Sequence, residues 1–424
     1  MKTFLRKLVL GALRSLAKMR VRRLRPFIIG VTGSVGKTST KDAIYHLLSK
    51  RYTVIRNEKS FNSEFGLPLA ILEQPSGFSS ATEWAGILLK ALWKALIGGK
   101  NLQMMVLEMG VDKPGDMNDL LHIVKPQIGV FTAVKPVHLA EGQFKDLDDI
   151  FAEKRKLVDT LPEKGMAILN ADDGYIVGLR SKTTCRQFFY GGSEIADLRV
   201  LEAETSLEGI RCTIQYKQEV LAGNFRLLGG YQVYVLLPAI AVGLTQGFTL
   251  QECMEGLSDF TPPPGRMSAL QGIRSSTILD STYNASPDAL REALNVLHEI
   301  APGRKIAVLG SMNELGAKSE RFHREAGRHA SRRTDILVTV GDMAKYIGEE
   351  AQKEGLAAES IHHCADAQVA MKLLSEMVKE GDTILVKGSQ NRVRLERLVA
   401  SLLADPSQSE HVLARQDKYW KTIE

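Results

Sequence analysis

The fold of this chain is decided by residues 27–40, which read FIIGVTGSVGKTST. The stretch begins with an apolar run, passes through a glycine-bearing turn and ends with residues that can start a helix. Glycines let backbone N–H groups close around phosphate oxygens, and a helix N-terminus adds partial positive charge there. Lys37 would reach the terminal phosphates, and the Thr38 hydroxyl would ligate Mg²⁺. The stretch therefore predicts a strand, a phosphate-binding loop and a helix.

The predicted loop departs in one position from the general GxxxxGK[ST] motif, because Val31 occupies the place of the first glycine. A glycine turn followed by chance by Lys-Thr is the alternative, but the apolar strand before the turn favours the phosphate loop. We assign the nucleotide to the loop residues Thr32, Gly33, Ser34, Val35, Gly36, Lys37, Thr38 and Ser39.

Side chains that could hold the metal follow the next apolar runs. Glu108 ends the run MMVLE, and His138 and Glu141 follow the run IGVFTAV. The carboxyl ends of parallel strands meet at one edge of a sheet, so Glu108 would face the phosphate loop with the oxygen ligand that Mg²⁺ prefers. Alone, Glu108 could equally be a solvated turn residue, and His138 a hydrogen-bonded loop histidine. Their order along the chain favours a metal site.

Short apolar runs alternate with helical stretches from residue 27 onward, which is the pattern of a parallel sheet covered by helices. The runs lie at 104–109, 128–134 and 167–170. Between about 184 and 228, alternating strands predict a small antiparallel sheet.

The Pro-rich turn at 261–265 can continue neither a helix nor a central strand, so we place a domain boundary there. TILD, KIAVLG, DILVTVG and DTILVKG follow, each with a helical stretch after it. The fold class is therefore α/β. We predict a basic helix at 1–25, a parallel-sheet ATP-binding domain with the phosphate loop at 26–264, and a Rossmann-like α/β domain at 265–424.

Positive charge is concentrated at the N-terminus. Residues 1–25 hold nine Lys and Arg and no acidic residue, whereas the remainder carries 46 basic and 49 acidic residues. A basic face for nucleic acid is therefore not expected, since the surplus does not extend along the chain. The four cysteines lack the spacing of a zinc site or a disulfide framework, so we expect a reducing, cytoplasmic environment.

Residues 1–25 are expected to form a basic amphipathic helix. The apolar positions that share one helical face are Leu5, Leu8, Val9, Ala12, Leu13 and Leu16. A membrane span needs roughly 20 apolar residues, which this stretch lacks, and Arg14 interrupts any signal-peptide core. Two interpretations stay open: the helix packs on the body of the protein, or it makes a peripheral contact with the inner face of the membrane.

Ten ordered motifs between about residues 27 and 403 give the chain a resemblance to the Mur ligase family, and most closely to its D-alanyl-D-alanine-adding members. The motifs are VTGSVGKTSTK (31–41), FNSEFGLPLAIL (61–72), VLEMG (106–110), HLAEG (138–142), FAEKRKLV (151–158), NADD (170–173), PGRM (264–267), LDSTYNASPD (279–288), VLGSMNELG (308–316) and VKGSQ (386–390).

The resemblance implies a role for each matching residue of the first domain. Lys37 and Thr38 would bind the β and γ phosphates and their Mg²⁺, with Glu108 as a metal ligand. His138 would serve a second Mg²⁺. Lys154 matches a lysine that the family carbamylates, and its carbamate would ligate the second ion. Without the resemblance, Lys154 would be interpreted as an exposed helix lysine.

The second domain would complete the nucleotide site. Arg266 matches a phosphate-contacting arginine, and the further nucleotide contacts implied are Asp280, Tyr283 and Asn284. The resemblance implies an ADP-forming ligase: ATP phosphorylates a carboxylate, and an amine then displaces phosphate to give an amide. The carboxylate would belong to a peptidoglycan precursor, and the amine to an amino acid or dipeptide.

Two departures from the family pattern keep the substrate open. Only the 25-residue helix precedes the first core strand, where the family has an N-terminal domain that holds the UDP-sugar. At 229–241, Tyr231-Gln232 and Val235 replace a His-Asn pair and an Asn, so adenine contacts would differ. One alternative is the same chemistry on a lipid-linked or other non-UDP carboxylate. Another is a non-catalytic ATP-binding module recruited to a membrane.

Overall fold

The computed structural model of the protein describes residues 2–58, 63–75, 81–99, 101–389, 393–417 and 420. Several predicted positions lie outside the described backbone or side chains, namely Leu5, Phe61, Asn62 and Gln390. The chain divides into two compact units. The first comprises residues 1–202, 213–223 and 234–258, and the second comprises residues 203–212, 224–233 and 259–424.

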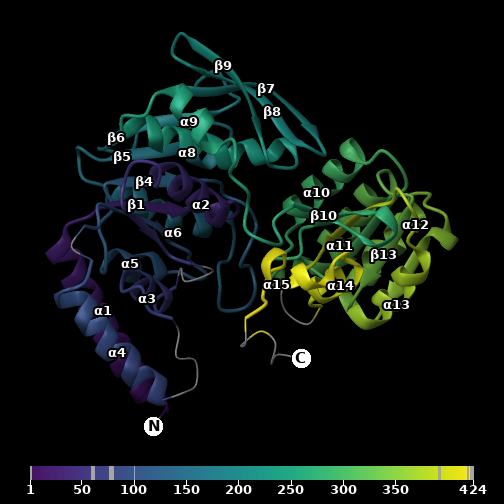
Figure 1. Ribbon diagram of the computed structural model, residues 1–424, viewed down its shortest axis with the longest axis horizontal. Helices are drawn as coiled ribbons and strands as arrows, with labels where there is room; N and C mark the ends of the chain where they lie inside the picture. Colours follow the sequence, from purple (N-terminus) through teal and green to yellow (C-terminus); the bar gives the residue numbers. More distant parts are fainter. Residues whose placement is uncertain are drawn as a thin grey trace. The chain divides into compact units, whose positions relative to one another are not determined.

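A nine-stranded sheet, shown with its helices in Figure 1, contains the predicted strands. Its order is β2 (Val54–Arg56), β3 (Met104–Glu108), β1 (Phe27–Thr32), β4 (Ile128–Phe131), β5 (Met166–Asn170), β6 (Arg186–Gly191), β7 (Leu198–Ser206), β8 (Gly209–Tyr216) and β9 (Glu219–Phe225). All pairs from β2 to β7 are parallel. The two-residue turns on either side of β8 require antiparallel neighbours. The predicted antiparallel strands therefore extend the central sheet instead of forming a separate one.

Helices cover both faces of this sheet. One face, which includes Ile28, Met105 and Phe131, shares a core with the first-unit helices α3 (Gly66–Ile71), α5 (Asp116–Leu121) and α6 (Leu147–Asp159). Helix α2 (Lys37–Leu48) packs against β1, β2 and β3 and against α9 (Leu250–Leu257). The unit also contains α7 (Gly174–Val177) and α8 (Val233–Thr245), besides the two helices described next. Because side chains alternate across a strand, apolar residues run almost without interruption along β1 and β3.

The basic N-terminal stretch forms α1 (Lys2–Leu24), as predicted, and it packs against α3 and α4 (Ala81–Leu96). Leu13 and Ala17 are fully buried in the same core as the sheet. Arg20 is also buried: it donates to Ile71 O at 2.5 Å and pairs with Glu73. Of the two interpretations left open by the sequence, packing on the protein accounts for this part of the helix.

The second unit contains a six-stranded sheet between two layers of helices. Its order is β10 (Ser268–Gln271), β11 (Thr277–Asp280), β15 (Thr383–Lys387), β12 (Lys305–Gly310), β13 (Ile336–Val340) and β14 (Ile361–Cys364). Only the β10–β11 pair is antiparallel. One face packs on α10 (Pro287–Ile300), α11 (Ser319–Ser331) and α12 (Lys345–Lys353). The other packs on α13 (Ala367–Met377) and α14 (Leu395–Leu402), and α15 (Ser409–Val412) follows.

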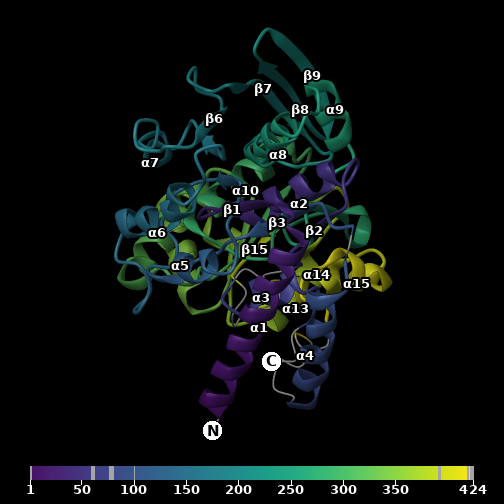
Figure 2. The same ribbon diagram turned by 90° about the vertical axis from the view of Figure 1, so that its left-hand side faces the viewer.

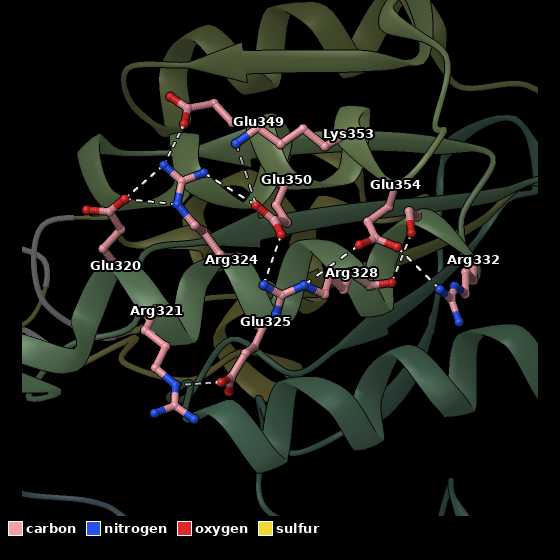
Figure 3. Close-up of polar contacts among 11 residues, drawn as sticks. Glu320, Arg321, Arg324, Glu325, Arg328, Arg332, Glu349, Glu350, Lys353 and Glu354 are labelled. Carbon is pink, nitrogen blue, oxygen red and sulfur yellow. Dashed lines mark hydrogen bonds and ion pairs between the residues drawn. The ribbon is translucent and has the colours of Figure 1, made fainter.

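A row of ion pairs connects α11 to α12 (Figure 3). Arg324 pairs with Glu349 at 3.0 Å, and Arg328 pairs with Glu350 at 3.0 Å. The two helices approach closely at Gly327, where an added Cβ would overlap Ile347 O. Glu349 and Arg328 are each 48% exposed, whereas Arg324 (23%) and Glu350 (11%) are more buried, so solvent weakens these pairs at their outer ends. The close approach at Gly327 therefore matters more for the packing of this pair.

Candidate nucleotide site

The phosphate loop, Gly33 to Gly36, joins β1 to α2, and two of its four residues are glycines. Gly36 precedes the helix with a φ of 80°, a left-handed conformation that favours glycine. The N-cap residue of α2, Gly36, makes no side-chain hydrogen bond to the helix, and the partial positive charge of a helix N-terminus favours a phosphate there. Lys37 begins the helix, and its Nζ donates to Ser34 O at 3.2 Å, folding the ammonium over the loop.

Residues that directly follow β4 hold this loop in place by hydrogen bonds. Thr132 Oγ1 donates to Val35 O at 2.6 Å, and Ser34 N donates to Ala133 O at 2.7 Å. The Ser34 hydroxyl both donates to Lys135 O and accepts from Lys135 N, at 3.0 and 2.9 Å. A Cβ at Gly33 would overlap Thr132 Oγ1, so glycine is required where the two segments meet. The loop is thus preorganised by the neighbouring strand end.

Thr38 and Glu108 meet at the edge of the sheet, as the positions of their elements along the chain predict. The Thr38 hydroxyl donates to Glu108 Oε2 at 2.8 Å, and only 2% of Glu108 is exposed. Asn57, which directly follows β2, fixes the backbone of Glu108 from the other side. Glu108 N donates to Asn57 Oδ1 at 2.8 Å, and Asn57 Nδ2 donates to Glu108 O at 3.0 Å. This pair of hydrogen bonds sets where the carboxylate lies.

Lys154 is a buried lysine and not an exposed one. It is fully buried on the inner face of α6, in register with Ile150 and Leu157. Its Nζ has no hydrogen-bond partner among the residues described. Burial, followed by the positive charge of Lys37, holds its pKa well below the ordinary value, although nearby carboxylates oppose this shift. Burial therefore favours the uncharged form of this amine, which has no hydrogen-bond partner among the residues described.

The helix that carries Lys154 is held in place by its neighbours. Glu153 accepts from Met117 N at 2.7 Å and from Lys156 Nζ at 2.6 Å, which ties α6 to the start of α5. Burial raises the pKa of Glu153, but these hydrogen bonds outweigh it and lower the pKa overall. A charged Glu153 thus fixes the orientation of the residue next to it in the chain.

His138 lies in the loop between β4 and α6 with a φ of 58°, and its Nε2 is 3.5 Å from Asp112 Oδ1. Across the part of the chain that is described, His, Cys, Asp and Glu side chains form no group of three or more able to hold a metal. A metal site here would thus need other donors, such as the Thr38 hydroxyl and a modified Lys154. The unpartnered, buried Lys154 Nζ beside Glu108 fits that requirement.

The second unit carries its own cluster at the carboxyl ends of β11 and β15. The Arg266 guanidinium lies 4.2 Å from the centre of the Tyr283 ring. Asp280, fully buried at the end of β11, accepts from Thr282 N and Oγ1 at 3.0 and 2.6 Å. Burial raises its pKa to about 6. Asn284 Oδ1 accepts from Ala285 N at 2.9 Å, which orders the turn after the strand.

Lys387 joins this cluster, although the sequence assigned it no role. Its Nζ donates to Ser281 Oγ at 3.1 Å and to Asn284 O at 2.9 Å. Burial and the charge of Arg266 lower its pKa to about 7. β11 and β15 are parallel neighbours, so their ends converge. The sequence could have indicated Lys387 as a site residue, because this lysine ends an otherwise apolar strand.

The predicted site residues thus form two groups. In the first unit, the phosphate loop, Glu108 and Lys154 share one neighbourhood, because the charges of Lys37 and Glu108 both act on Lys154. In the second unit, Arg266, Asp280, Tyr283 and Asn284 lie around the end of β11. The sequence missed Asn57, Thr132 and Lys387. Each of these follows or ends a strand at the same edge as the predicted residues.

Comparison with known proteins matches both halves of the chain. The Mur ligase middle domain matches residues 31–243, and the Mur ligase glutamate ligase domain matches residues 265–390. The UDP-N-acetylmuramoyl-tripeptide–D-alanyl-D-alanine ligase of Bacillus subtilis (strain 168) is 29% identical, with 94% of this chain and 80% of the relative covered. The same ligase of Mycobacterium leprae (strain TN) is 31% identical, with 94% and 78% covered.

A solved structure gives the same answer. The MurF ligase of Thermotoga maritima in complex with ADP superposes with a TM-score of 0.76, at 26% identity, over 92% of this chain and 83% of the other. The expected resemblance and the α/β fold are confirmed, as are an ADP-forming ligase and its use of ATP. The chain belongs to the Mur ligase family.

Proposed function

We propose that this ligase adds an amino acid or dipeptide to a carboxylate of a peptidoglycan precursor, with D-alanyl-D-alanine as the first amine to test. The relatives from Bacillus subtilis and Mycobacterium leprae, named for that dipeptide and a UDP-linked tripeptide, support the choice. The observation that carries the proposal is the contact of Thr38 with the buried Glu108 beside the phosphate loop.

We propose that Thr38 and Glu108 hold one Mg²⁺ ion and that His138 and a carbamate on Lys154 hold a second. A hydroxyl and a carboxylate oxygen 2.8 Å apart are donors that Mg²⁺ accepts. A neutral amine is the form of lysine that can take up carbon dioxide, and the burial of the unpartnered Lys154 favours that form. When bound, Mg²⁺ would offset the negative charge of the phosphates.

The chain's own residues then act on the reacting groups. The N–H groups of the loop and of the start of α2 would bind the phosphates, and Lys37 would place its ammonium on the γ-phosphoryl. A carboxylate oxygen attacks the γ-phosphorus and ADP leaves. The amine then attacks the acyl carbon, inorganic phosphate leaves and an amide remains.

We propose contacts from the second unit as well. Arg266 would bind a phosphate, and its stacking on Tyr283 would limit the orientations of the guanidinium. Further nucleotide contacts would come from Asp280 and Asn284, which end and follow β11.

The location we propose is cytoplasmic, where ATP and a reducing environment are found. All four cysteines are free and buried. Within the described residues, no helix combines the length and the apolar character that crossing a membrane requires. A peripheral contact with the inner face of the membrane, involving residues 1–25, remains part of the proposal.

Oxygen-18 in the acceptor carboxylate tests the mechanism. An acyl-phosphate intermediate transfers one labelled oxygen to the released inorganic phosphate, because the carboxylate oxygen becomes the bridge and leaves with phosphorus. Mass spectrometry of the phosphate should therefore find the label. Unlabelled phosphate released alongside amide product would contradict an acyl-phosphate.

The second candidate function is the same chemistry on a lipid-linked carboxylate. It is favoured by the concentration of cations in residues 1–25. Parallel assays with a UDP-linked and a lipid-linked acceptor distinguish the two substrates, since the phosphorylation step is common to both.

A further inference from the structure

Helix α4 is apolar on two faces, and the fold buries only one of them. Ile87, Ala91 and Ala95 recur every fourth residue and are buried with Leu13 and Ala17 of α1. The opposite side exposes Leu89 (71%), Leu92 (41%), Trp93 (54%), Leu96 (51%) and, just after the helix, Ile97 (55%).

These five residues, here called the α4 apolar face, follow the i, i+3, i+4, i+7 spacing of one helical side. Figure 2 shows α1 and α4 both extending beyond the edge of the first unit's sheet. A contiguous patch of large exposed apolar side chains on a folded protein marks a surface for interaction. The α4 apolar face is therefore a docking surface.

Basic residues outnumber acidic ones around this surface, although α4 carries Glu83 in its first turn. Residues 1–25 and 84–99 contain no Asp or Glu. Some of their cations are neutralised from nearby: Arg6 and Arg14 pair with Glu64, and Lys94 pairs with Glu73.

Several cations remain in excess. The ones without a carboxylate partner among the described residues are Lys7, Lys18, Arg22, Arg23, Arg25 and Lys90, of which Arg23 donates to backbone carbonyls at the end of α4. Lys90 lies on α4 itself, next to the apolar stripe, whereas the cations of α1 belong to a helix that packs on the other side of α4. Lys90 can therefore contact an anionic surface directly, and the cations of α1 add a longer-range attraction to it.

We propose that the α4 apolar face lies in the headgroup boundary of an anionic phospholipid bilayer, with Lys90 against the lipid phosphates and the cations of α1 adding a longer-range attraction. A tryptophan such as Trp93 favours this boundary, since its ring is apolar and its N–H is polar. Helix α4 has 16 residues, which suits a helix lying in the interface plane better than one that spans. A second copy of the chain fits less well, because a two-fold interface would oppose identical basic surfaces.

The proposal changes the part assigned to α1. One of the two interpretations of the sequence made the apolar stripe of α1 the membrane-contacting element, but Leu13 of that stripe and the neighbouring Ala17 are buried against the protein. Here α1 supplies charge, and α4 supplies the apolar contact. Deleting α1 would expose the core, so point substitutions on the outer surface are the appropriate test.

The test is co-sedimentation of the full chain with vesicles of equal parts phosphatidylglycerol and phosphatidylcholine, against vesicles of phosphatidylcholine alone. The wild-type protein should bind only the anionic vesicles, and binding should weaken as salt shortens the Debye length. Trp93→Ser with Leu96→Ser should weaken binding by on the order of tenfold. Lys90→Gln should weaken it by about fivefold. Replacing Lys7, Lys18 and Arg22 by Gln should weaken it by less than that for each cation, because α1 packs on the other side of α4.

The matched control replaces two apolar residues of similar exposure elsewhere, Val220→Ser with Val369→Ser, and should bind like the wild type. Circular dichroism melting of each variant confirms that it is folded. The proposal is overturned if the wild-type protein fails to bind anionic vesicles or if the α4 substitutions leave binding unchanged. Loss of a dimer in light scattering on Trp93→Ser, without vesicle binding by the wild type, would instead make the surface a self-association interface.

Discussion

Replacing Asn57 by Ala should damage both the stability of the fold and its use of Mg²⁺. The side chain is fully buried and makes two hydrogen bonds to the backbone of Glu108, at 2.8 and 3.0 Å. Alanine would leave a buried N–H and a buried C=O without these partners. Each such group costs about 1–3 kcal/mol, so the free energy of unfolding should fall by about 2–6 kcal/mol.

The second effect concerns the metal. Without Asn57, the backbone of Glu108 is free to shift, and the 2.8 Å contact between Thr38 and the carboxylate is no longer fixed. Residues that orient a metal ligand typically change metal affinity by about 10- to 100-fold when removed. The Mg²⁺ concentration for half-maximal ADP formation should therefore rise by at least about tenfold.

Two measurements separate these effects: urea unfolding monitored by circular dichroism, and ADP release at graded Mg²⁺ concentrations. Asp382→Ala is the matched control, because Asp382 is also buried but lies before β15, at the amino end of the strand. It should lower stability without changing the Mg²⁺ requirement. If Asn57→Ala lost stability but kept the wild-type Mg²⁺ dependence, the positioning role assigned to Asn57 would be wrong.

Three further changes test other parts of the structure. Lys154→Met should abolish amine-dependent ADP formation. It should also raise the stability of the metal-free, bicarbonate-free protein by about 1–3 kcal/mol, since it removes a buried amine without a hydrogen-bond partner among the described residues. A drop in stability would count against this. Because burial lowers the pKa of Lys387 to about 7 from 10.5, the unfolded chain binds more protons between these pH values. Urea unfolding should thus show wild-type stability rising with pH across this window, and Lys387→Met should flatten the slope. Gly327→Ala should lower stability by about 1–3 kcal/mol, because the added Cβ clashes with Ile347 O. Gly11→Ala, which has open space around it, should instead raise stability by about 0.5–1 kcal/mol. Equal effects of the two substitutions in thermal melts would refute the close approach of α11 and α12.

Most of the sheet could be predicted because its strands are short, almost wholly apolar runs bounded by turn residues. β1, β3 and β12 are of this kind. The missed strands lie at sheet edges, where hydrogen bonding to one neighbour suffices and apolar character is weak. β2 has three residues, and β14 reads Ile-His-His-Cys. Neither carries a periodicity that distinguishes it from a loop.

The site was predictable where strand order decides it and obscure where packing does. Glu108 could be placed beside the loop because the ends of β1 and β3 converge. Lys154 would have been read as exposed from its residue type alone, but Ile150 and Leu157, four residues before it and three after it, put it on the buried face. Asn57 was missed because the strand before it is too short to recognise.

The central claim is that this chain couples ATP cleavage to formation of an amide bond. Its most direct test is ADP release with Mg²⁺ and a panel of UDP-linked and lipid-linked tripeptide acceptors, each assayed with D-alanyl-D-alanine and with single amino acids. We predict ADP formation only when an acceptor and an amine are both present, an amide product of matching mass, and neither with Lys37→Ala. ATP binding without ADP formation by any pair, or ADP formation that needs no amine and no acceptor, would contradict the claim.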